Sequence, residues 1–441
     1  MSNLRFIALK ALNKIENDKA YSNIILDKII NKEDISKRDA AFVCNLVYGV
    51  LERKIQLDYI ISIYSKLPMK KINTDVLNIL RMGTYQLLFM DKVPDSAAVN
   101  ESVSLAKRCK KKSAGGFINA ILRNVSKNKG NIPMPNDEIE YLHINYSCPK
   151  DIITLWIDSY GLDVTKELLK SLVEKPDLII RNNNLKNSEN ELIDILEKEG
   201  IAAKVIDNMK NSLVLTNSGS VANINAFKEG RFHIQDLASQ ILCKLVEPKE
   251  GNTIIDLCAA PGGKSFTLAE MMNNKGKVYS FDLYEHKIKL INDGANRLGI
   301  NIIEAKIRDA LSNDDSLELA DKVLCDAPCS GLGIIRRKPE IKYKNLEDIK
   351  ELPALQYKML CNAGKLTKPN GILLYSTCTL NPNENGKVAD EFLKSNKNFE
   401  AYSLNTAGLV RTIDEPKNQF TFMPQTNHTD GFFIAAFKRI R

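Results

Sequence analysis

The C-terminal half of this chain takes its fold from the stretch Ile254-Ile255-Asp256-Leu257-Cys258-Ala259-Ala260-Pro261-Gly262-Gly263-Lys264-Ser265. An apolar strand here runs into a turn of small residues with two glycines and then into a helix. Such a turn lets the backbone approach a ligand at the carboxyl end of the strand, where doubly wound sheets bind nucleotide-like cofactors. The stretch is neither G-x-G-x-x-G nor G-x-x-x-x-G-K-[ST], which disfavours a dinucleotide or a nucleoside triphosphate.

Strand, turn and helix alternate from about residue 235 to the C-terminus. The strand candidates are 253–257, 277–281, 301–307, 322–325, 371–376 and 431–437, with helical patterns between most of them. This alternation is typical of a parallel sheet covered on both faces by helices. Residues 235–441 are therefore predicted to form an α/β, Rossmann-like domain.

Acidic residues follow three of these strands. Asp282 comes 19 residues after Gly263, at a position suited to accept hydrogen bonds from ribose hydroxyls, while Asp309 and Asp326 follow the next two strands. Several acidic strand ends suit a cofactor with an exposed ribose and a positive centre, so S-adenosylmethionine is predicted. Asp282 alone indicates only a ribose, and an ordinary turn residue is the competing interpretation for Asp309.

Two of the nine cysteines occupy positions suited to chemistry. Cys329 follows a proline after the fourth strand, and Cys378 lies in a polar Ser-Thr-Cys-Thr turn after the fifth, so both are expected at the catalytic edge of the sheet. No CxxC pair exists and the four histidines are scattered, so no metal site is expected. Six cysteines are interpreted as small buried apolar residues: Cys44, Cys109, Cys148, Cys243, Cys325 and Cys361.

A pyrimidine substrate would explain why two thiols and a sulfonium are gathered at one site. C5 of cytosine is a poor nucleophile, and direct attack on a methyl group would be slow. Addition of a thiolate at C6 raises the electron density at C5 and divides the barrier into two smaller steps. The sequence thus favours methylation of a pyrimidine carbon.

The remaining half of the chain divides into two predicted domains. Residues 1–140 show apolar positions at helical spacing and almost no strand signals, which predicts a helical domain. Residues 145–234 follow a proline-containing linker and mix strand patterns with a helix, whose start is marked by the capping-box pair Ser188 and Glu191. We expect a small α+β module there.

Positive charge is concentrated in the helical half. The chain has 62 basic and 54 acidic residues, a net charge of +8, and residues 102–136 contain eight basic residues and no acidic one. This segment is predicted to bind a polyanion such as RNA, with a solvated lysine-rich face as the alternative. Its basic residues include Lys107, Arg108, Lys110, Lys111, Lys112 and Arg123.

The motifs together resemble a known family, the RNA cytosine-C5 methyltransferases. In the catalytic half the resemblance lies in residues 254–265, Asp326–Gly331 and Ser376–Thr379. In the N-terminal half, residues 38–49, 93–101 and 116–124 are similar to the NusB-like domain of bacterial members that modify small-subunit ribosomal RNA. The resemblance implies an all-α NusB-like domain, an α+β RRM-like module and a class I S-adenosylmethionine-dependent methyltransferase domain.

The resemblance also implies roles for individual residues. Cys378 matches the family's nucleophile, Cys329 matches the cysteine that helps to break the covalent adduct, and Asp326 is a candidate to hold the cytosine edge. Arg336, Arg337 and Lys338 resemble a basic segment suited to the RNA backbone, against the alternative of a solvated charge run. Cofactor contacts are implied at Cys258, Ala259, Ala260, Pro261, Gly262, Gly263, Lys264, Asp282, Asp309 and Asp326.

The implied partner is 16S ribosomal RNA, free or in early assembly, and the implied target is a loop cytosine, because an unstacked base is accessible. We expect a monomer with no membrane contact. The longest apolar stretches are strand-sized and the N-terminus shows no secretory signal, so a cytoplasmic location is expected.

Three other functions compete with this interpretation. A methyltransferase of the same chemistry acting on transfer RNA is disfavoured only by the NusB-like half. A non-catalytic RNA-binding or antitermination factor would not need both thiols and three acidic strand ends. A nicotinamide-dependent oxidoreductase would need the glycine fingerprint that this chain lacks.

Overall fold

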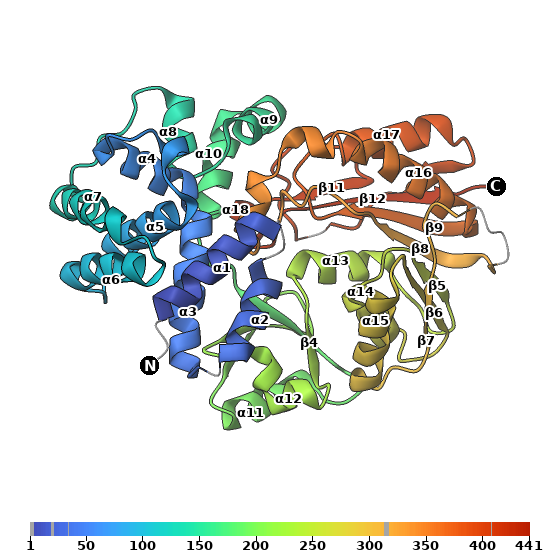
Figure 1. The fold of residues 1–441 in the computed structure, drawn as a ribbon. Coiled ribbons are helices and arrows are strands. Elements are labelled where there is room, and N and C mark those ends of the chain that lie inside the picture. The colour runs from blue at the N-terminus through green and yellow to red at the C-terminus, as the bar shows by residue number, and fades with distance from the viewer. Residues whose placement is uncertain (1–3, 19–21, 34, 313–316, 407) are drawn as a thin grey trace. The chain divides into compact units, whose positions relative to one another are not determined.

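The computed structural model describes residues 4–18, 22–33, 35–312, 317–406 and 408–441 (Figure 1). The chain forms two compact units. Unit 1 comprises Met1–Glu174 and Ile335–Lys344, and unit 2 comprises Lys175–Ile334 and Asn345–Arg441. None of the described helices combines the length and the apolar composition that a bilayer span requires.

Unit 1 is helical, as predicted, and buries one apolar core between its helices. Polar side chains start several of these helices: Ser36 accepts a hydrogen bond from the Asp39 amide, and Asn73 accepts one from the Asp75 amide. The helices are α1 (Leu4–Asp18), α2 (Ser22–Glu33), α3 (Lys37–Glu52), α4 (Lys54–Tyr64), α5 (Thr74–Phe89), α6 (Asp95–Arg108), α7 (Gly115–Asn128), α8 (Glu138–Asn145), α9 (Lys150–Tyr160) and α10 (Leu162–Ser171), with short 3-10 turns η1 (Met69–Lys71), η2 (Lys112–Ala114) and η4 (Pro339–Tyr343).

Unit 1 extends beyond the domain boundary that we predicted at residues 140–145. Helices α8, α9 and α10 pack with it, and α9 contributes the fully buried Trp156. Ten residues from the middle of the catalytic sequence, 335–344, also belong to it. The compact unit thus includes helices that we assigned to the α+β module.

Three side chains of η4 hold the 335–344 segment in unit 1. The Glu340 carboxylate accepts hydrogen bonds from the amide and hydroxyl of Ser22 at 2.8 and 2.9 Å. The buried Lys342 ammonium donates to the Glu52 carbonyl at 2.6 Å, and the Tyr343 hydroxyl donates to the Leu51 carbonyl at 2.7 Å. Burial lowers the pKa of Lys342 to about 8.

Unit 2 begins with a four-stranded antiparallel sheet in the order β2-β3-β1-β4. The capping box at Ser188 and Glu191 is present and starts α11 (Glu189–Lys198), which confirms that prediction. The strands are β1 (Leu178–Asn182), β2 (Ala202–Val205), β3 (Ser212–Thr216) and β4 (Phe232–Ile234), accompanied by η3 (Val221–Asn223) and α12 (Asn225–Lys228).

The second sheet of unit 2 belongs to the predicted α/β domain. Its strand order is β10-β12-β9-β8-β5-β6-β7, with β11 beside β12. Strands β5, β6, β7, β8 and β9 pair parallel with one another, whereas β12 pairs antiparallel with β9, β10 and β11. The sheet is therefore mixed, not parallel throughout as predicted. Its strands are β5 (Thr253–Asp256), β6 (Lys277–Asp282), β7 (Ile303–Ile307), β8 (Ala320–Asp326), β9 (Thr367–Thr377), β10 (Phe399–Ala401), β11 (Gln419–Phe422) and β12 (Phe432–Arg439).

Helices cover both faces of this sheet (Figure 1), and each face has its own apolar core. One core includes residues of α13 (Leu237–Val246), α14 (Gly263–Met271) and α15 (Glu285–Leu298), and the other includes residues of α16 (Leu352–Lys365) and α17 (Gly386–Ser395). Shorter helical segments are α18 (Pro424–Asn427) and η5 (Leu346–Ile349). The chain passes from β5 to β6 on one side and returns to β8 on the other, which creates the switch point where such sheets bind ligands.

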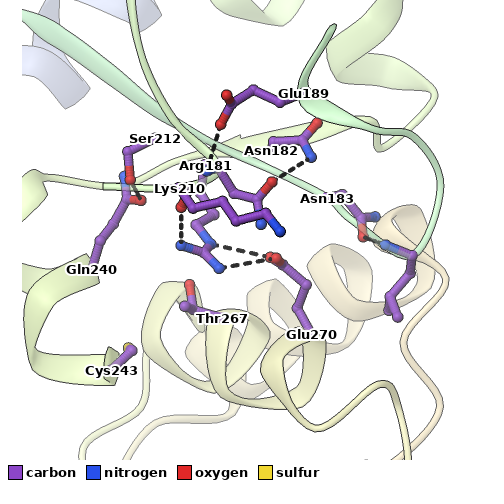
Figure 2. Close-up of polar contacts among 12 residues, drawn as sticks. Arg181, Asn182, Asn183, Glu189, Lys210, Ser212, Gln240, Cys243, Thr267 and Glu270 are labelled. Atoms are coloured by element: carbon purple, nitrogen blue, oxygen red, sulfur yellow. Dashed lines mark hydrogen bonds and ion pairs between the residues drawn. The ribbon is translucent and has the colours of Figure 1, made fainter. Parts of the chain in front are cut away.

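The small sheet holds α14 through a buried polar network. Figure 2 shows the Arg181 guanidinium between the Glu270 carboxylate, at 3.1 and 3.3 Å, and the Lys210 carbonyl. Thr267, on the same helix, donates to Gln235 at 2.6 Å. Burial raises the pKa of Glu270 to about 7, although the charge of Arg181 opposes this effect. Because α14 starts at the glycine turn, the small sheet indirectly supports the predicted cofactor loop.

Removing Arg181 should strongly destabilise unit 2. In Arg181→Met the Glu270 carboxylate, 2% exposed, loses its partner, and breaking one side of a buried ion pair costs about 3–5 kcal/mol. We expect calorimetry of the full chain to show a lower unfolding temperature, with partial recovery in the double variant Arg181→Met/Glu270→Leu. Arg231→Met, which breaks the exposed pair with Glu229, is the matched control and should cost less than about 1 kcal/mol. Equal losses in the two single variants would contradict this account.

Candidate functional site

The glycine turn lies where the sequence predicted, between the end of β5 and the start of α14. Gly262 has φ of 105°, a left-handed conformation that favours glycine, and a Cβ there would lie 2.3 Å from the Phe266 ring. The Ala259 amide donates to the Phe281 carbonyl at 2.8 Å, which fixes the turn to β6. The turn therefore follows the carboxyl end of β5, next to β6.

Asp256 ends β5 and is fully buried. One carboxylate oxygen accepts a hydrogen bond from Ser265 at 2.7 Å, and Ser280 donates to the same Ser265 hydroxyl at 2.8 Å. The other oxygen, Oδ1, is buried without a hydrogen-bond partner. Burial raises the pKa of Asp256 to about 7, against the hydrogen bond of Ser265 and the charge of Lys264.

The other predicted acidic strand ends differ from one another. Asp282 is the last residue of β6, is 6% exposed, and accepts hydrogen bonds from the Leu283 amide and the Lys287 ammonium. Asp309 lies two residues beyond β7, is exposed, and accepts a hydrogen bond from the Leu311 amide, as a turn residue would. Asp282 is thus a fixed acceptor beside the glycine turn, whereas Asp309 also satisfies the turn interpretation.

Lys264, Asp326 and Ser376 form one polar group where α14, β8 and β9 meet. The Lys264 ammonium donates to Oδ2 of Asp326 at 2.6 Å, and the Ser376 hydroxyl donates to Oδ1 at 2.7 Å. Burial alone would lower the pKa of Lys264, but the charge and hydrogen bond of Asp326 outweigh it and raise the pKa. The lysine is therefore a fixed cation, and Asp326 is oriented through both of its oxygens.

The structure brings the two candidate thiols together. The Sγ atoms of Cys329 and Cys378 lie 3.3 Å apart, and both side chains are half-buried. They follow β8 and β9, which are adjacent and parallel, as predicted. The hydrogen bond with Cys378, burial and the charges of Cys378 and Glu384 raise the pKa of the Cys329 thiol well above its usual value. Cys329 therefore keeps its proton at neutral pH.

Close backbone contacts join the loops that carry these thiols. The Gly333 amide donates to the Cys378 carbonyl at 3.1 Å, and the Gly431 amide donates to the Gly333 carbonyl at 2.9 Å. A Cβ on Gly333 would lie 1.9 Å from the Gly431 carbonyl oxygen, so glycine is required for this approach. The segment before β12 thus packs directly on the thiol loops.

The six cysteines that we interpreted as buried apolar residues divide into two groups. Cys148, Cys243 and Cys325 are buried as predicted, whereas Cys44, Cys109 and Cys361 are only partly buried. Burial raises the pKa of the Cys148 and Cys243 thiols to about 12, which makes them unreactive. Within the described ranges, no group of three or more acidic, cysteine or histidine side chains is arranged to hold a metal ion.

The predicted basic residues lie on unit 1. Lys110 has φ of 59° and follows the end of α6, so the lysine cluster lies between α6 and η2. Arg108 stacks on the Phe6 ring at 4.3 Å, and Lys111 is half-buried. The other members of the group, Lys107, Lys110, Lys112 and Arg123, are exposed. Arg336, Arg337 and Lys338 precede η4 in the segment held by unit 1 and are half-buried.

Sequence reasoning missed the residues that support the thiol loops. Glu384, Gln356 and Thr379 are all fully buried and hydrogen-bonded to residues flanking Cys329. The only sequence signal was the polar run Asn381–Asn385 after β9, which reads as an ordinary turn. Gln356 lies on α16 and carried no signal.

Comparison with known proteins identifies the class. Models of three families match successive parts of the chain: the NusB family over residues 2–127, an RsmF/B-like ferredoxin-like domain over 148–222, and 16S rRNA methyltransferase RsmB/F over 243–438. Together with the glycine turn and the paired thiols, these matches define an S-adenosylmethionine-dependent methyltransferase with a helical NusB domain and a ferredoxin-like middle domain.

Full-length relatives identify the family. A probable ribosomal RNA small subunit methyltransferase B of Bacillus subtilis is 35% identical, with 99% of each chain covered. Ribosomal RNA small subunit methyltransferase B of Proteus mirabilis is 30% identical over 98% of each chain. The solved structure titled PH0851 is similar at a TM-score of 0.85 and 26% identity, over 100% of this chain and 99% of that one. The chain belongs to the 16S rRNA methyltransferase RsmB/F family.

Proposed function

We propose that this enzyme methylates C5 of a specific cytosine in 16S ribosomal RNA, using S-adenosylmethionine, through a covalent bond between Cys378 and C6. The observation that carries the proposal is the pair of half-buried thiols with Sγ atoms 3.3 Å apart, at the ends of β8 and β9. A methyltransferase acting on a nitrogen or oxygen atom needs no such pair, because those atoms are themselves nucleophilic. Carbon C5 needs a nucleophile to activate it.

The residues present fit the proposed cofactor. The glycine turn brings backbone to the carboxyl end of β5, and Asp282 ends the neighbouring strand as an acceptor for ribose hydroxyls. The unpartnered Oδ1 of Asp256 marks a buried acceptor beside this turn. We assign cofactor binding to residues 258–264, Asp282 and Asp326, and Asp309 is the least constrained member of the set. Bound S-adenosylmethionine supplies an electrophilic methyl group.

The chain's own residues perform the remaining chemistry. Cys378 gives up its proton and attacks as the thiolate, so that Sγ bonds to C6 and the electron pair of the C5–C6 double bond moves to C5. After methylation the C5 proton is lost to a base, the double bond forms again, and the C6–S bond breaks with its electron pair on sulfur. Cys329, which keeps its proton, can donate a hydrogen bond to the departing sulfur and so assist this last step. Asp326, oriented by Lys264 and Ser376, is the proposed contact to the cytosine edge.

The basic residues at the end of α6 and in η2 are proposed to bind the RNA backbone. In Lys110→Glu/Lys111→Glu/Lys112→Glu, we expect weaker RNA binding at every sequence and a salt slope that is smaller by about one for each lost phosphate contact. Fluorescence titrations at several salt concentrations measure both quantities. The matched control reverses Lys66, Lys70 and Lys71, three exposed lysines of the same unit. If both triple variants change affinity and slope equally, the cluster at 110–112 is not the RNA contact.

Methyl transfer to ribosomal RNA tests the proposed function directly. Purified enzyme, transcribed 16S rRNA and S-adenosylmethionine should yield 5-methylcytosine at one position, and bisulfite sequencing locates it. Transfer RNA should remain unmodified under the same conditions. Methylation of another atom, or of transfer RNA alone, would refute the proposal. Since ribosomal RNA is made and modified in the bacterial cytoplasm, we place the enzyme there.

A further inference from the structure

We propose that Glu384 and Gln356 are positioning residues that hold the backbone on both sides of Cys329 and so fix its thiol against Cys378. The inference deepens the proposed function and rests on it, because it assigns Cys329 the task of helping to release the methylated base. Neither residue needs to contact the RNA or the cofactor for this role. We call Glu384 and Gln356 together the thiol clamp.

Gln356 holds the residue before Cys329. Its Nε2 atom donates to the Pro328 carbonyl at 2.9 Å and to the Glu384 carboxylate at 2.9 Å. Two acceptors at this nitrogen fix the orientation of the amide, because a flipped amide would place oxygen against oxygen. The side chain is fully buried on α16, so a rigid helix supports the contact.

Glu384 holds the residue after Cys329. Its Oε2 atom accepts a hydrogen bond from the Ser330 amide at 2.8 Å, and its Oε1 atom accepts one from the Asn381 side chain at 2.8 Å. The carboxylate is fully buried, and a buried carboxylate is costly unless several donors surround it. Its own backbone is anchored as well, because the buried Tyr375 hydroxyl donates to the Glu384 carbonyl at 2.6 Å.

A second contact ties the clamped loop to the Cys378 turn. The Ser330 and Thr379 hydroxyls lie 2.6 Å apart, and each of these residues directly follows one of the two thiols. Both hydroxyls are buried, so water competes little for the bond. The residue before Cys329 is therefore held by Gln356, and the residue after it is held by Glu384. Thr379 links that second residue to the Cys378 turn.

The charge of Glu384 adds to the effect of its geometry. It contributes to the raised pKa of the Cys329 thiol, after the hydrogen bond with Cys378 and burial. A neutral thiol beside the departing sulfur of Cys378 can donate a hydrogen bond, whereas a thiolate would repel it. The clamp thus favours both the place and the protonation state that release of the base requires.

Loss of the clamp should slow release of the RNA more than formation of the adduct. The clamp holds the two residues that directly flank Cys329, whereas it contacts the Cys378 turn at Asn381, three residues beyond that thiol. Addition of Cys378 to C6 should therefore continue. A displacement of about 1 Å at a catalytic group can cost about 10²-fold in rate. We therefore expect the covalent RNA-protein complex to persist.

The test compares Glu384→Ala, Gln356→Met and Glu384→Gln with Cys329→Ala, using transcribed 16S rRNA and S-adenosylmethionine. Glu384→Ala and Gln356→Met should show a persistent slow band on a denaturing gel, a kcat lower by about 10²-fold and a KM for RNA changed less than about threefold. Glu384→Gln should be intermediate, because its amide oxygen still accepts the Ser330 amide. Should Glu384→Ala fail to fold, Gln356→Met carries the test, since it keeps the side-chain length.

Glu415→Ala is the matched control, because Glu415 accepts hydrogen bonds from the Thr421 amide and hydroxyl in the same unit. It should lose stability without accumulating the complex. If Cys329→Ala accumulates the complex while both clamp variants turn over normally, the clamp is overturned and the proposed function stands. If Cys329→Ala itself accumulates nothing and methylates normally, the proposed function of Cys329 fails and the clamp fails with it.

Discussion

Cys378→Ala should abolish methyl transfer to 16S rRNA while cofactor binding stays nearly unchanged. Without its sulfur, C5 of cytosine has no activated form, and removal of an enzyme's nucleophile typically costs on the order of 10⁴- to 10⁶-fold in kcat. The cofactor loop should be unaffected, because it follows β5 whereas Cys378 follows β9, two strands away. Transfer of a labelled methyl group measures turnover, and calorimetric titration measures cofactor affinity.

The control for this variant is Cys361→Ala, which removes another partly buried thiol from the same unit. It should retain activity, because Cys361 lies on α16 and its sulfur accepts a hydrogen bond only from Asn396 among the contacts described. Turnover by Cys378→Ala above about one hundredth of the normal rate would refute the nucleophile assignment, whatever the behaviour of the control.

Cys329→Ala should trap the enzyme on its substrate. Addition by Cys378 needs no second thiol, but release of the methylated base loses the hydrogen bond that Cys329, with its Sγ at 3.3 Å, can give to the departing sulfur. We expect a stable RNA-protein complex that survives denaturation and migrates slowly on a gel. The double variant Cys329→Ala/Cys378→Ala should form none.

Two controls define this result. Omission of S-adenosylmethionine should prevent the stable complex, because an unmethylated adduct reverses, and digestion of the RNA should return the band to the position of free protein. Normal turnover with no trapped complex would mean that Cys329 is a structural residue.

The sequence predicted the parts of the fold that depend on local patterns. The helical domain, the capping box at Ser188 and the strands before Asp282, Asp326 and Cys378 all lie where periodicity and turn residues placed them. Each of these signals is short in range. The proximity of Cys329 and Cys378 was also predictable, because parallel neighbouring strands end at the same edge of a sheet.

The parts that the sequence did not predict depend on contacts between distant segments. The sequence of β12 would be the same whether the strand paired parallel or antiparallel. In the structure it pairs antiparallel with both β9 and β11, which are distant from it or separated from it by a turn in the sequence. Gln356 and Glu384 are ordinary polar residues until α16 and the turn after β9 meet beneath Cys329. Buried polar groups of this kind cannot be separated from surface residues by composition.

Because residues 335–344 belong to unit 1, this unit cannot be completed when its first 174 residues have been synthesised. Unit 1 is translated up to Glu174 long before its last segment emerges from the ribosome. At 5–20 residues per second, the roughly 160 residues in between take about 10 to 30 s, during which the positions beside Ser22 and Glu52 lack Glu340 and Lys342. The N-terminal unit is therefore completed only after residues 335–344 have been synthesised. By then the loop that carries Cys329 has also been made.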